Sequence, residues 1–375
     1  MWMYCSICIL ILGSAIIFLV WYLKFIVAAN AGAPKIYYTR STLTKHILNH
    51  GKHMLRPLQV PFWNRNGHTQ TILTYLAPRP NCKFSREYIL LKDGGAVALD
   101  WIVELDGESR DFGNTDPILI VIPELGSDAY TVSPLCRLAS KHGCRSVVFN
   151  RRGHGHSFLL TAKLQEPGDP SDLRSVVEYV QSQFPRSTLS AVAYGMGTNV
   201  LFSYMGEYGS SCRLSSVVCV SPGYEAEYIL SRCLSFPYHF AMLYMSKREL
   251  AAHAASLSKV VNVAAAMATN SLIDFEELLY CRPAGYASME RYWEHNNPMR
   301  EVDEVTIPVL CINSLDDPIC KKRHIPYSLF TDCPNFMLLT TTTGGHCGFL
   351  EGSYLERWAD KVAVDYILSV LSFTF

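Results

Sequence analysis

The stretch LSAVAYGMGTNVL, residues 189–201, runs from a short apolar segment directly into what looks like the start of a helix. From Ala193 to Gly197 it has the spacing small-x-Ser-x-Gly, which is typical of a strand that turns sharply into a helix and displays one reactive side chain. The position that a serine nucleophile would occupy holds Gly195, which has no side chain. The sequence therefore predicts the turn of a nucleophile elbow without its nucleophile.

The segments on both sides of this turn alternate between apolar runs and helical stretches. Before them, EYILL and AVALDWIVE flank an Asp-Gly-Gly turn, which predicts a hairpin. Short continuous apolar runs separated by helices indicate buried parallel strands with crossovers, and so a doubly wound, mostly parallel sheet of the α/β class. The runs are PILIVI, RSVVFN, LSAVAY, SSVVCV, IPVLCIN and FMLLTT, and the helices are expected over residues 131–142, 170–183, 196–207 and 354–372.

Residues 222–300 interrupt the alternation, because they are mostly helical and rich in aromatic residues and methionine. An insertion at this point lies over the carboxyl ends of the strands, where open α/β sheets bind their ligands. We therefore expect one α/β domain over residues 86–375 with a helical cap at about 222–300. A connector and N-terminal arm over residues 25–85 would precede this domain.

The first 23 residues, MWMYCSICILILGSAIIFLVWYL, contain no charged side chain. Their length suits a membrane-spanning helix, and Trp and Tyr near both ends are typical of interface anchors. We expect a transmembrane anchor over residues 1–24; the alternative is a signal peptide cleaved at AANAGA, which would leave a secreted protein. Basic residues follow the segment, so the positive-inside rule predicts that the domain is cytosolic. These residues are Lys24, Lys35, Arg40 and Lys45. The endoplasmic reticulum or another internal membrane is a possible location of the anchor.

Composition excludes some classes of function. The chain has 33 basic and 33 acidic residues, so no overall positive field indicates binding to nucleic acid. Its 13 cysteines are odd in number and several lie in apolar runs, which indicates small core residues rather than a disulfide framework. Apart from Cys5 and Cys8 in the apolar first segment, no Cys-x-x-Cys pair or His/Cys cluster has zinc spacing, so we expect no metal and no cofactor.

Two later motifs stand in the chain order nucleophile, acid, histidine. NSLDDPIC follows one buried run, and TTTGGHCGFLEG follows the next. Asp317 is expected to orient the imidazole of His346 through its Nδ1–H group, as the acid of a catalytic triad does. Asp316 would then be a turn or cap residue, although the sequence alone also allows the two aspartates to exchange roles.

The loop after Ile122 is expected to supply a backbone N–H group for an oxyanion site, where glycine normally lets the backbone approach closely. Here Pro123 is followed by Glu124, whose carboxylate would repel a developing oxyanion. Thr198 and Ser190 carry hydroxyls nearby, but neither lies on the strained turn that presents a nucleophile. Gly195 at the elbow and Glu124 in this loop are two separate departures from a hydrolase site, and both predict a loss of catalysis.

Several motifs together resemble a known family. PFWNRNGHTQT, VVFNRRGHG, GDPSDLRSVVEYV, VLCINSLDDPIC and GGHCGF occur in this order over about residues 55–370. The set resembles the membrane-anchored α/β hydrolases related to abhydrolase domain-containing proteins 1, 2 and 3 and the bacterial YheT-type esterases. Within that family the sequence looks most like the branch of abhydrolase domain-containing protein 15. That branch is similar to this sequence in having no serine at the elbow. We expect His68, in the first motif, to pack the N-terminal arm on the domain.

This resemblance implies an α/β-hydrolase fold and action on the ester bonds of lipids such as monoacylglycerols and phospholipids. It places the acid and the histidine at Asp317 and His346, and the oxyanion contacts at the backbone N–H groups of Leu125 and Met196. It also implies a role in the control of lipolysis and lipid storage. A cyclic-nucleotide phosphodiesterase is the protein partner that the resemblance implies.

Three functions remain open at this point. The first is a pseudo-hydrolase that binds a lipid or acyl-ester ligand and regulates lipid metabolism. The second is an active carboxylic ester or lipid hydrolase, in which His346 and Asp317 activate a water, aided by Glu124. The third is a partner-binding surface with a collapsed pocket, and an apolar cavity beneath residues 222–300 would favour the first over it.

Overall fold

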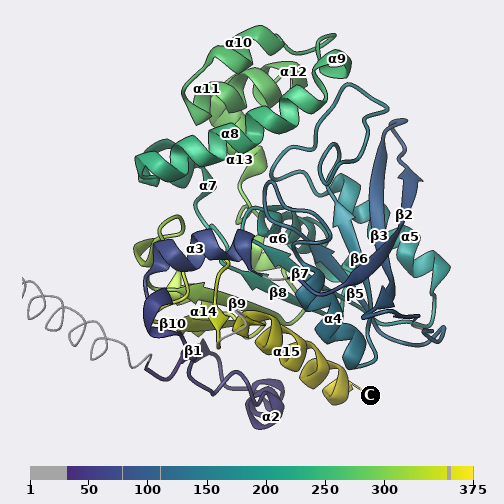
Figure 1. The fold of residues 1–375 in the computed structure, drawn as a ribbon, viewed down its shortest axis with the longest axis vertical. Helices are drawn as coiled ribbons and strands as arrows, with labels where there is room; N and C mark the ends of the chain where they lie inside the picture. The colour runs from purple at the N-terminus through teal and green to yellow at the C-terminus, as the bar shows by residue number, and fades with distance from the viewer. Residues whose placement is uncertain (1–31, 78, 110, 353–355, 375) are drawn as a thin grey trace, which may run out of the picture.

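The computed structural model describes residues 32–77, 79–109, 111–352 and 356–374 (Figure 1). Its centre is a ten-stranded sheet in the order β1-β10-β9-β8-β7-β5-β6-β3-β2, with β4 paired to β3. The run from β10 to β6 is parallel, and β1, β2, β3 and β4 pair antiparallel. The strands are β1 (Lys35–Tyr38), β2 (Cys82–Leu90), β3 (Ala96–Leu105), β4 (Glu108–Ser109), β5 (Ile118–Ile122), β6 (Arg145–Asn150), β7 (Leu189–Tyr194), β8 (Ser216–Val220), β9 (Val309–Ser314) and β10 (Phe336–Thr341).

The predicted strands are confirmed, and burial explains their sequence pattern. Every residue of β5, β7, β8, β9 and β10 is buried, because helices cover both faces of the parallel part of the sheet. Such strands are apolar throughout instead of alternating. The predicted hairpin is also present, as β2 and β3 pair along their length.

Helices cover the sheet on two sides. The cluster on one side includes α4 and α15, and the cluster on the other includes α5, α6 and α14. The first three predicted helices begin within two residues of their expected starts, whereas the terminal helix begins at Trp358 rather than at 354. The bounds are α4 (Ser133–Lys141), α5 (Ser171–Gln183), α6 (Gly197–Tyr208), α14 (Tyr327–Asp332) and α15 (Trp358–Thr374).

The expected helical cap lies between β8 and β9 and stands above the sheet in Figure 1. It has its own hydrophobic cluster, in which Leu250, Phe275 and Tyr292 are almost fully buried. A helical layer with a separate core can cover the strand ends without taking part in the sheet. Its helices are α7 (Ala226–Tyr228), α8 (Phe236–Ala252), α9 (Ala254–Leu257), α10 (Val263–Ala268), α11 (Leu272–Glu276), α12 (Arg282–Ala284) and α13 (Met289–Asn296).

The N-terminal arm does more than connect. Its β1 extends the sheet at β10, α2 (Thr42–His50) packs against α15, and α3 (Gly67–Leu76) lies below the cap (Figure 1). His68 lies at the start of α3, and its Nδ1 is 2.6 Å from Tyr238 Oη on α8. The His68 side chain therefore links the N-terminal arm to the cap.

The predicted transmembrane helix at residues 1–24 lies outside the described residues, as do residues 25–31 of the predicted connector. Among the helices in the described ranges, none combines the length and the apolar character that a membrane crossing requires.

Candidate active site

The turn that follows β7 has the backbone of an elbow. Gly195 has φ +45°, in the left-handed region that glycine adopts without the steric cost of a Cβ. Its N–H donates to Val220 O at 2.9 Å, and α6 begins two residues later at Gly197. Strand, turn and helix are therefore arranged as the sequence indicates, with no side chain at the tip.

Glu124 reaches this turn from the loop after β5. The backbone N–H of Leu125 donates to Glu124 Oε1 at 2.9 Å, and the N–H of Met196 donates to Oε2 at 3.0 Å. These are the two groups that the family resemblance implies as oxyanion donors. In the structure both bind the carboxylate of this same chain.

The carboxylate also fills the place of the missing side chain. A Cβ built on Gly195 would lie 1.2 Å from Glu124 Oε2 and 2.9 Å from His346 Nε2. A serine at this position cannot coexist with Glu124 as it lies in the structure. The sequence interpretation treats Glu124 as a charge that repels an oxyanion or as an aid to water activation, and it misses this occupation of space.

His346 lies between two carboxylates. Its Nδ1 is 2.9 Å from Asp317 Oδ2, and its Nε2 is 3.4 Å from Glu124 Oε2. Asp317 is held in turn, because its Oδ1 accepts the N–H groups of Ile319 and Cys320 at 2.7 and 2.8 Å. The imidazole is thus fixed in orientation from both sides.

Asp316 has a different environment. Its carboxylate accepts the hydroxyl of Ser314 and the N–H of Gly345, the latter at 2.9 Å. Asp316 therefore stabilises the turn before His346, and Asp317 is the aspartate that contacts the imidazole.

The charge state of His346 follows from these neighbours. Burial, the largest single influence, lowers the pKa of its imidazole, but the Asp317 carboxylate and the neighbouring Cys347 and Cys320 together hold the pKa well above its ordinary value. The raised pKa favours the protonated ring, and in that form the imidazole has no free nitrogen to act as a general base.

Helix α3 holds the loop that carries His346. The His346 N–H donates to Thr71 Oγ1 at 2.9 Å, and Thr74 Oγ1 donates to Cys347 O at 3.0 Å. Gln70 is fully buried and exchanges two hydrogen bonds with the backbone of Leu350. The sequence analysis does not assign these roles, although the block GHTQT contains all but one of the residues.

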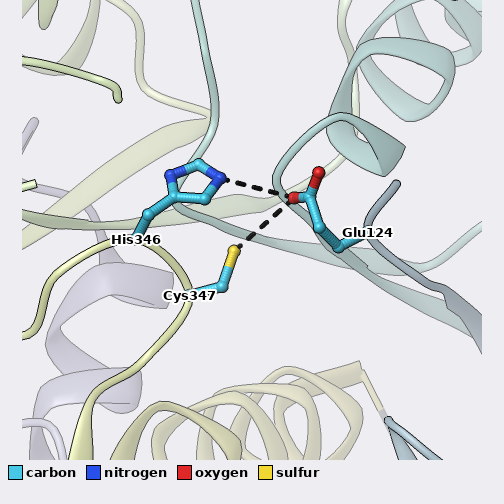
Figure 2. A group of neighbouring side chains, drawn as sticks. All are labelled: Glu124, His346 and Cys347. Atoms are coloured by element: carbon cyan, nitrogen blue, oxygen red, sulfur yellow. Dashed lines mark hydrogen bonds and ion pairs between the residues drawn. The ribbon is translucent and has the colours of Figure 1, made fainter. Parts of the chain in front are cut away.

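Cys347 is a second side chain that the sequence analysis misses. Its Sγ lies 3.8 Å from Glu124 Oε2 and 3.8 Å from Val220 O, beside the imidazole of His346 (Figure 2). Burial raises the pKa of this thiol. The two hydroxyls weighed in the sequence analysis are engaged elsewhere: Thr198 donates to Gly195 O at 2.6 Å, and Ser190 pairs with Ser216 at 3.0 Å.

A cavity of about 60 Å³ opens between this group and the cap. Gly195, Glu124 and His346 form its polar end. The remaining lining is mostly apolar and comes from both the sheet domain and the cap, including Met196, Ile229, Leu230, Met242, Met245 and Ile319. The volume suffices for a few water-sized groups, which corresponds to a short part of an acyl chain.

Comparisons with known proteins agree with this architecture. The family model Hydrolase_4, described as serine aminopeptidase, S33, matches residues 113–335. Human protein ABHD15 is 37% identical over 319 residues, which cover 83% of this chain and 68% of the relative. Human phospholipase ABHD3 is 26% identical over 373 residues, covering 96% of this chain and 90% of the relative.

Solved structures show the same fold. A structure of the Pyrococcus furiosus esterase Pf2001 matches with a TM-score of 0.51 at 14% identity, over 76% of this chain and 91% of that one. At this identity the likeness extends to the fold alone. With the family model covering more than half of the sequence, the chain belongs to the α/β-hydrolase family and has relatives among the ABHD proteins.

Proposed function

We propose that this protein binds an acyl lipid beneath its cap without cleaving it, and acts as a binding or regulatory member of its family. The observation that supports this most directly is the position of Glu124. Its carboxylate takes the place of the nucleophile and uses both backbone donors of the oxyanion site. A developing oxyanion would meet a filled site with a negative charge in it.

Hydrolysis by an activated water is disfavoured on the same geometry. Such a mechanism needs a neutral imidazole whose Nε2 faces the water, whereas the Nε2 of His346 is directed at Glu124 Oε2, 3.4 Å away, and the raised pKa of the ring favours its protonated form. Loss of the nucleophile alone costs on the order of 10⁶ in turnover in a serine protease. The second candidate function is an active ester hydrolase. The observation that favours it is the contact between Asp317 and His346, which a hydrolase would use as its acid and base.

The ligand class follows from the cavity and the relatives. Its walls are apolar, and human ABHD3 is named a phospholipase. The present volume does not hold a complete lipid. Three methionines line the cavity, and flexible thioether side chains can rearrange around a longer chain. A membrane location, which the family resemblance implies, would place this cavity close to its ligand.

The experiment measures binding and turnover on one preparation of the full-length chain in detergent. A fluorescent monoacylglycerol analogue should bind with one site per chain, while short-chain and monoacylglycerol esters should not turn over. A fluorophosphonate probe should leave the protein unlabelled. Labelling of the protein, or ester turnover that His346→Ala abolishes, would overturn the proposal in favour of a hydrolase.

A variant that fills the cavity tests the location of the ligand. Met242→Trp adds volume at a buried position in the lining and should abolish binding of the analogue. Met267→Trp, at a partly exposed position of the same cap, is the matched control and should bind normally. Binding that persists in Met242→Trp would place the ligand elsewhere.

A further inference from the structure

Three side chains with metal-binding atoms meet at the position of the missing nucleophile. Glu124 comes from the loop after β5, and His346 and Cys347 come from the loop after β10 (Figure 2). Glu124 Oε2 lies 3.4 Å from His346 Nε2 and 3.8 Å from Cys347 Sγ, and all three ligand atoms lie within 4.8 Å of one another.

These separations suit one small ion. Zinc binds thiolate sulfur at about 2.3 Å and imidazole nitrogen or carboxylate oxygen at about 2.0–2.2 Å, mostly in tetrahedral geometry. Ligand atoms on such a tetrahedron are about 3.3–3.7 Å apart. The two separations from Glu124 Oε2 are within about 0.1 Å of this range, so an ion at the centre needs only small side-chain movements.

The surrounding hydrogen bonds orient the ligand atoms. Asp317 holds Nδ1 of His346 and so leaves Nε2 directed at Glu124, which is the carboxylate–histidine–metal arrangement of many zinc sites. The N–H groups of Leu125 and Met196 fix the Glu124 carboxylate. Cys347 has φ +57°, an uncommon conformation for a residue other than glycine.

The charges also balance. A carboxylate and a thiolate with a neutral imidazole carry two negative charges, which a divalent cation neutralises in a buried place. Binding requires the Cys347 thiol to lose its proton and Nε2 of His346 to carry none. Oxygen, nitrogen and sulfur donors together match a borderline-soft ion better than Mg²⁺ or Ca²⁺.

We propose that Glu124, His346 and Cys347 bind Zn²⁺, with a fourth coordination position towards the cavity that Glu124 and His346 line. The ion would hold Glu124 at the elbow. This site shares Glu124 and the cavity with the proposed lipid binding, and lipid binding measured with zinc removed by a chelator distinguishes the two proposals.

A second group, Asp317, Cys320 and His346, also lies within 4.8 Å. It is the weaker candidate because Asp317 Oδ2 pairs with Nδ1 of the same ring that would have to serve as a ligand. An ion there would have to break the bond that fixes the imidazole. The first group contains Cys347 and the second Cys320, so substitutions of these two cysteines distinguish the two sites.

The test loads the full-length protein, stripped of metal in detergent, with Zn²⁺ or Co²⁺. Elemental analysis should find one tightly held zinc per chain, and the cobalt form should show the intense visible bands of tetrahedral geometry with a thiolate charge-transfer band. Cys347→Ser should lose that charge-transfer band, and both Cys347→Ser and Glu124→Gln should lose stoichiometric zinc. Asp317→Asn should weaken zinc binding by roughly 10–100-fold.

Cys320→Ser is the matched control and should retain one zinc with the charge-transfer band unchanged. Circular dichroism and the unfolding temperature of each metal-free variant separate loss of the ligand from loss of the fold. Absence of stoichiometric zinc in the folded parent protein would overturn the proposal. So would loss of zinc in Cys320→Ser while Cys347→Ser retains it.

Discussion

A carboxylate oxygen stands where residue 195 would carry its Cβ, and the same carboxylate takes two backbone N–H groups that a substrate oxygen would need. Gly195 and Glu124 therefore form one arrangement instead of two unrelated losses. Glu124 fits because residue 195 has no side chain. Residue 195 has no space for one because Glu124 is there.

The single change Gly195→Ser is expected to fail as a restoration of chemistry. The new Cβ would overlap Glu124 Oε2, and a side chain at φ +45° adds strain of roughly 1–2 kcal/mol. The variant should melt at a lower temperature than the parent and should not react with a fluorophosphonate probe, as judged by gel fluorescence.

The double change Gly195→Ser with Glu124→Gly removes the overlap and frees both N–H groups. It should label with the probe, and adding His346→Ala should suppress the labelling. Equal labelling of the single and double variants would show that Glu124 moves aside readily. A folded double variant without labelling would mean that the cavity differs from an esterase pocket at further positions.

Among the helices, α3 stabilises the loop between β10 and α15 through hydrogen bonds. Gln70 donates to Asn64 O at 3.0 Å and Leu350 O at 3.2 Å, and it accepts the Leu350 N–H at 2.8 Å. Gly67 allows the close approach of α3 to the Asp316 turn, since a Cβ there would lie 2.1 Å from Asp316 O. A helix of the N-terminal arm thus positions both the acid turn and the histidine loop.

Gln70→Leu should destabilise the protein by about 1–3 kcal/mol, because it leaves buried backbone groups of Leu350 without partners. Chemical denaturation with tryptophan fluorescence measures this loss. Gln59→Leu, at an exposed position of the same arm, is the control and should change stability little. An unfolding free energy of Gln70→Leu equal to that of the parent protein would contradict the proposed stabilisation of the histidine loop by α3.

At the scale of the whole molecule, three hydrophobic clusters share the stability: one on each face of the sheet and one in the cap. The cap cluster contains a buried acid, Glu276, whose carboxylate accepts the hydroxyl of Tyr292. Burial raises the pKa of Glu276 from 4.5 to about 7, although the Tyr292 hydroxyl opposes this shift. The folded state therefore binds more protons than the unfolded state between these two values.

Stability from the protonated form of Glu276 is fully present below pH 4.5 and is lost as pH rises to about 7. The shift corresponds to about 3 kcal/mol. Glu276→Gln stays neutral, so it should be clearly more stable than the parent protein at pH 8 and should differ less at pH 5. Thermal unfolding at both pH values measures this, with the exposed Glu290→Gln as control. An equal effect of Glu276→Gln at both values would contradict the prediction.

The sequence predicts the parallel sheet, the hairpin and the cap well, because continuous apolar runs and helical stretches are local patterns. It does not predict β1, since four residues, Lys35–Tyr38, pair at the sheet edge without clear alternation. The chain order of Asp317 and His346 is also readable, and the structure places them in contact.

The remaining parts of the site depend on side-chain direction between distant segments. Glu124 and His346 are more than 200 positions apart, so no spacing rule predicts that their side chains meet at Gly195. Zinc motifs are recognised by short intervals between ligands, and for this reason the group with Cys347 gives no sequence signal. A family motif marks the arm, but only the folded chain shows that Gln70 and Thr71 hold the histidine loop.

The overlap between residue 195 and Glu124 also restricts the order of evolutionary change. An ancestor with serine at the elbow had to lose that side chain before, or together with, the arrival of a glutamate in this position after β5. Glutamate here and glycine at the elbow should consequently co-occur among descendants, and serine with glutamate should be selected against. This pair of positions offers a marker, readable from sequence alone, for separating non-cleaving lineages from hydrolytic ones.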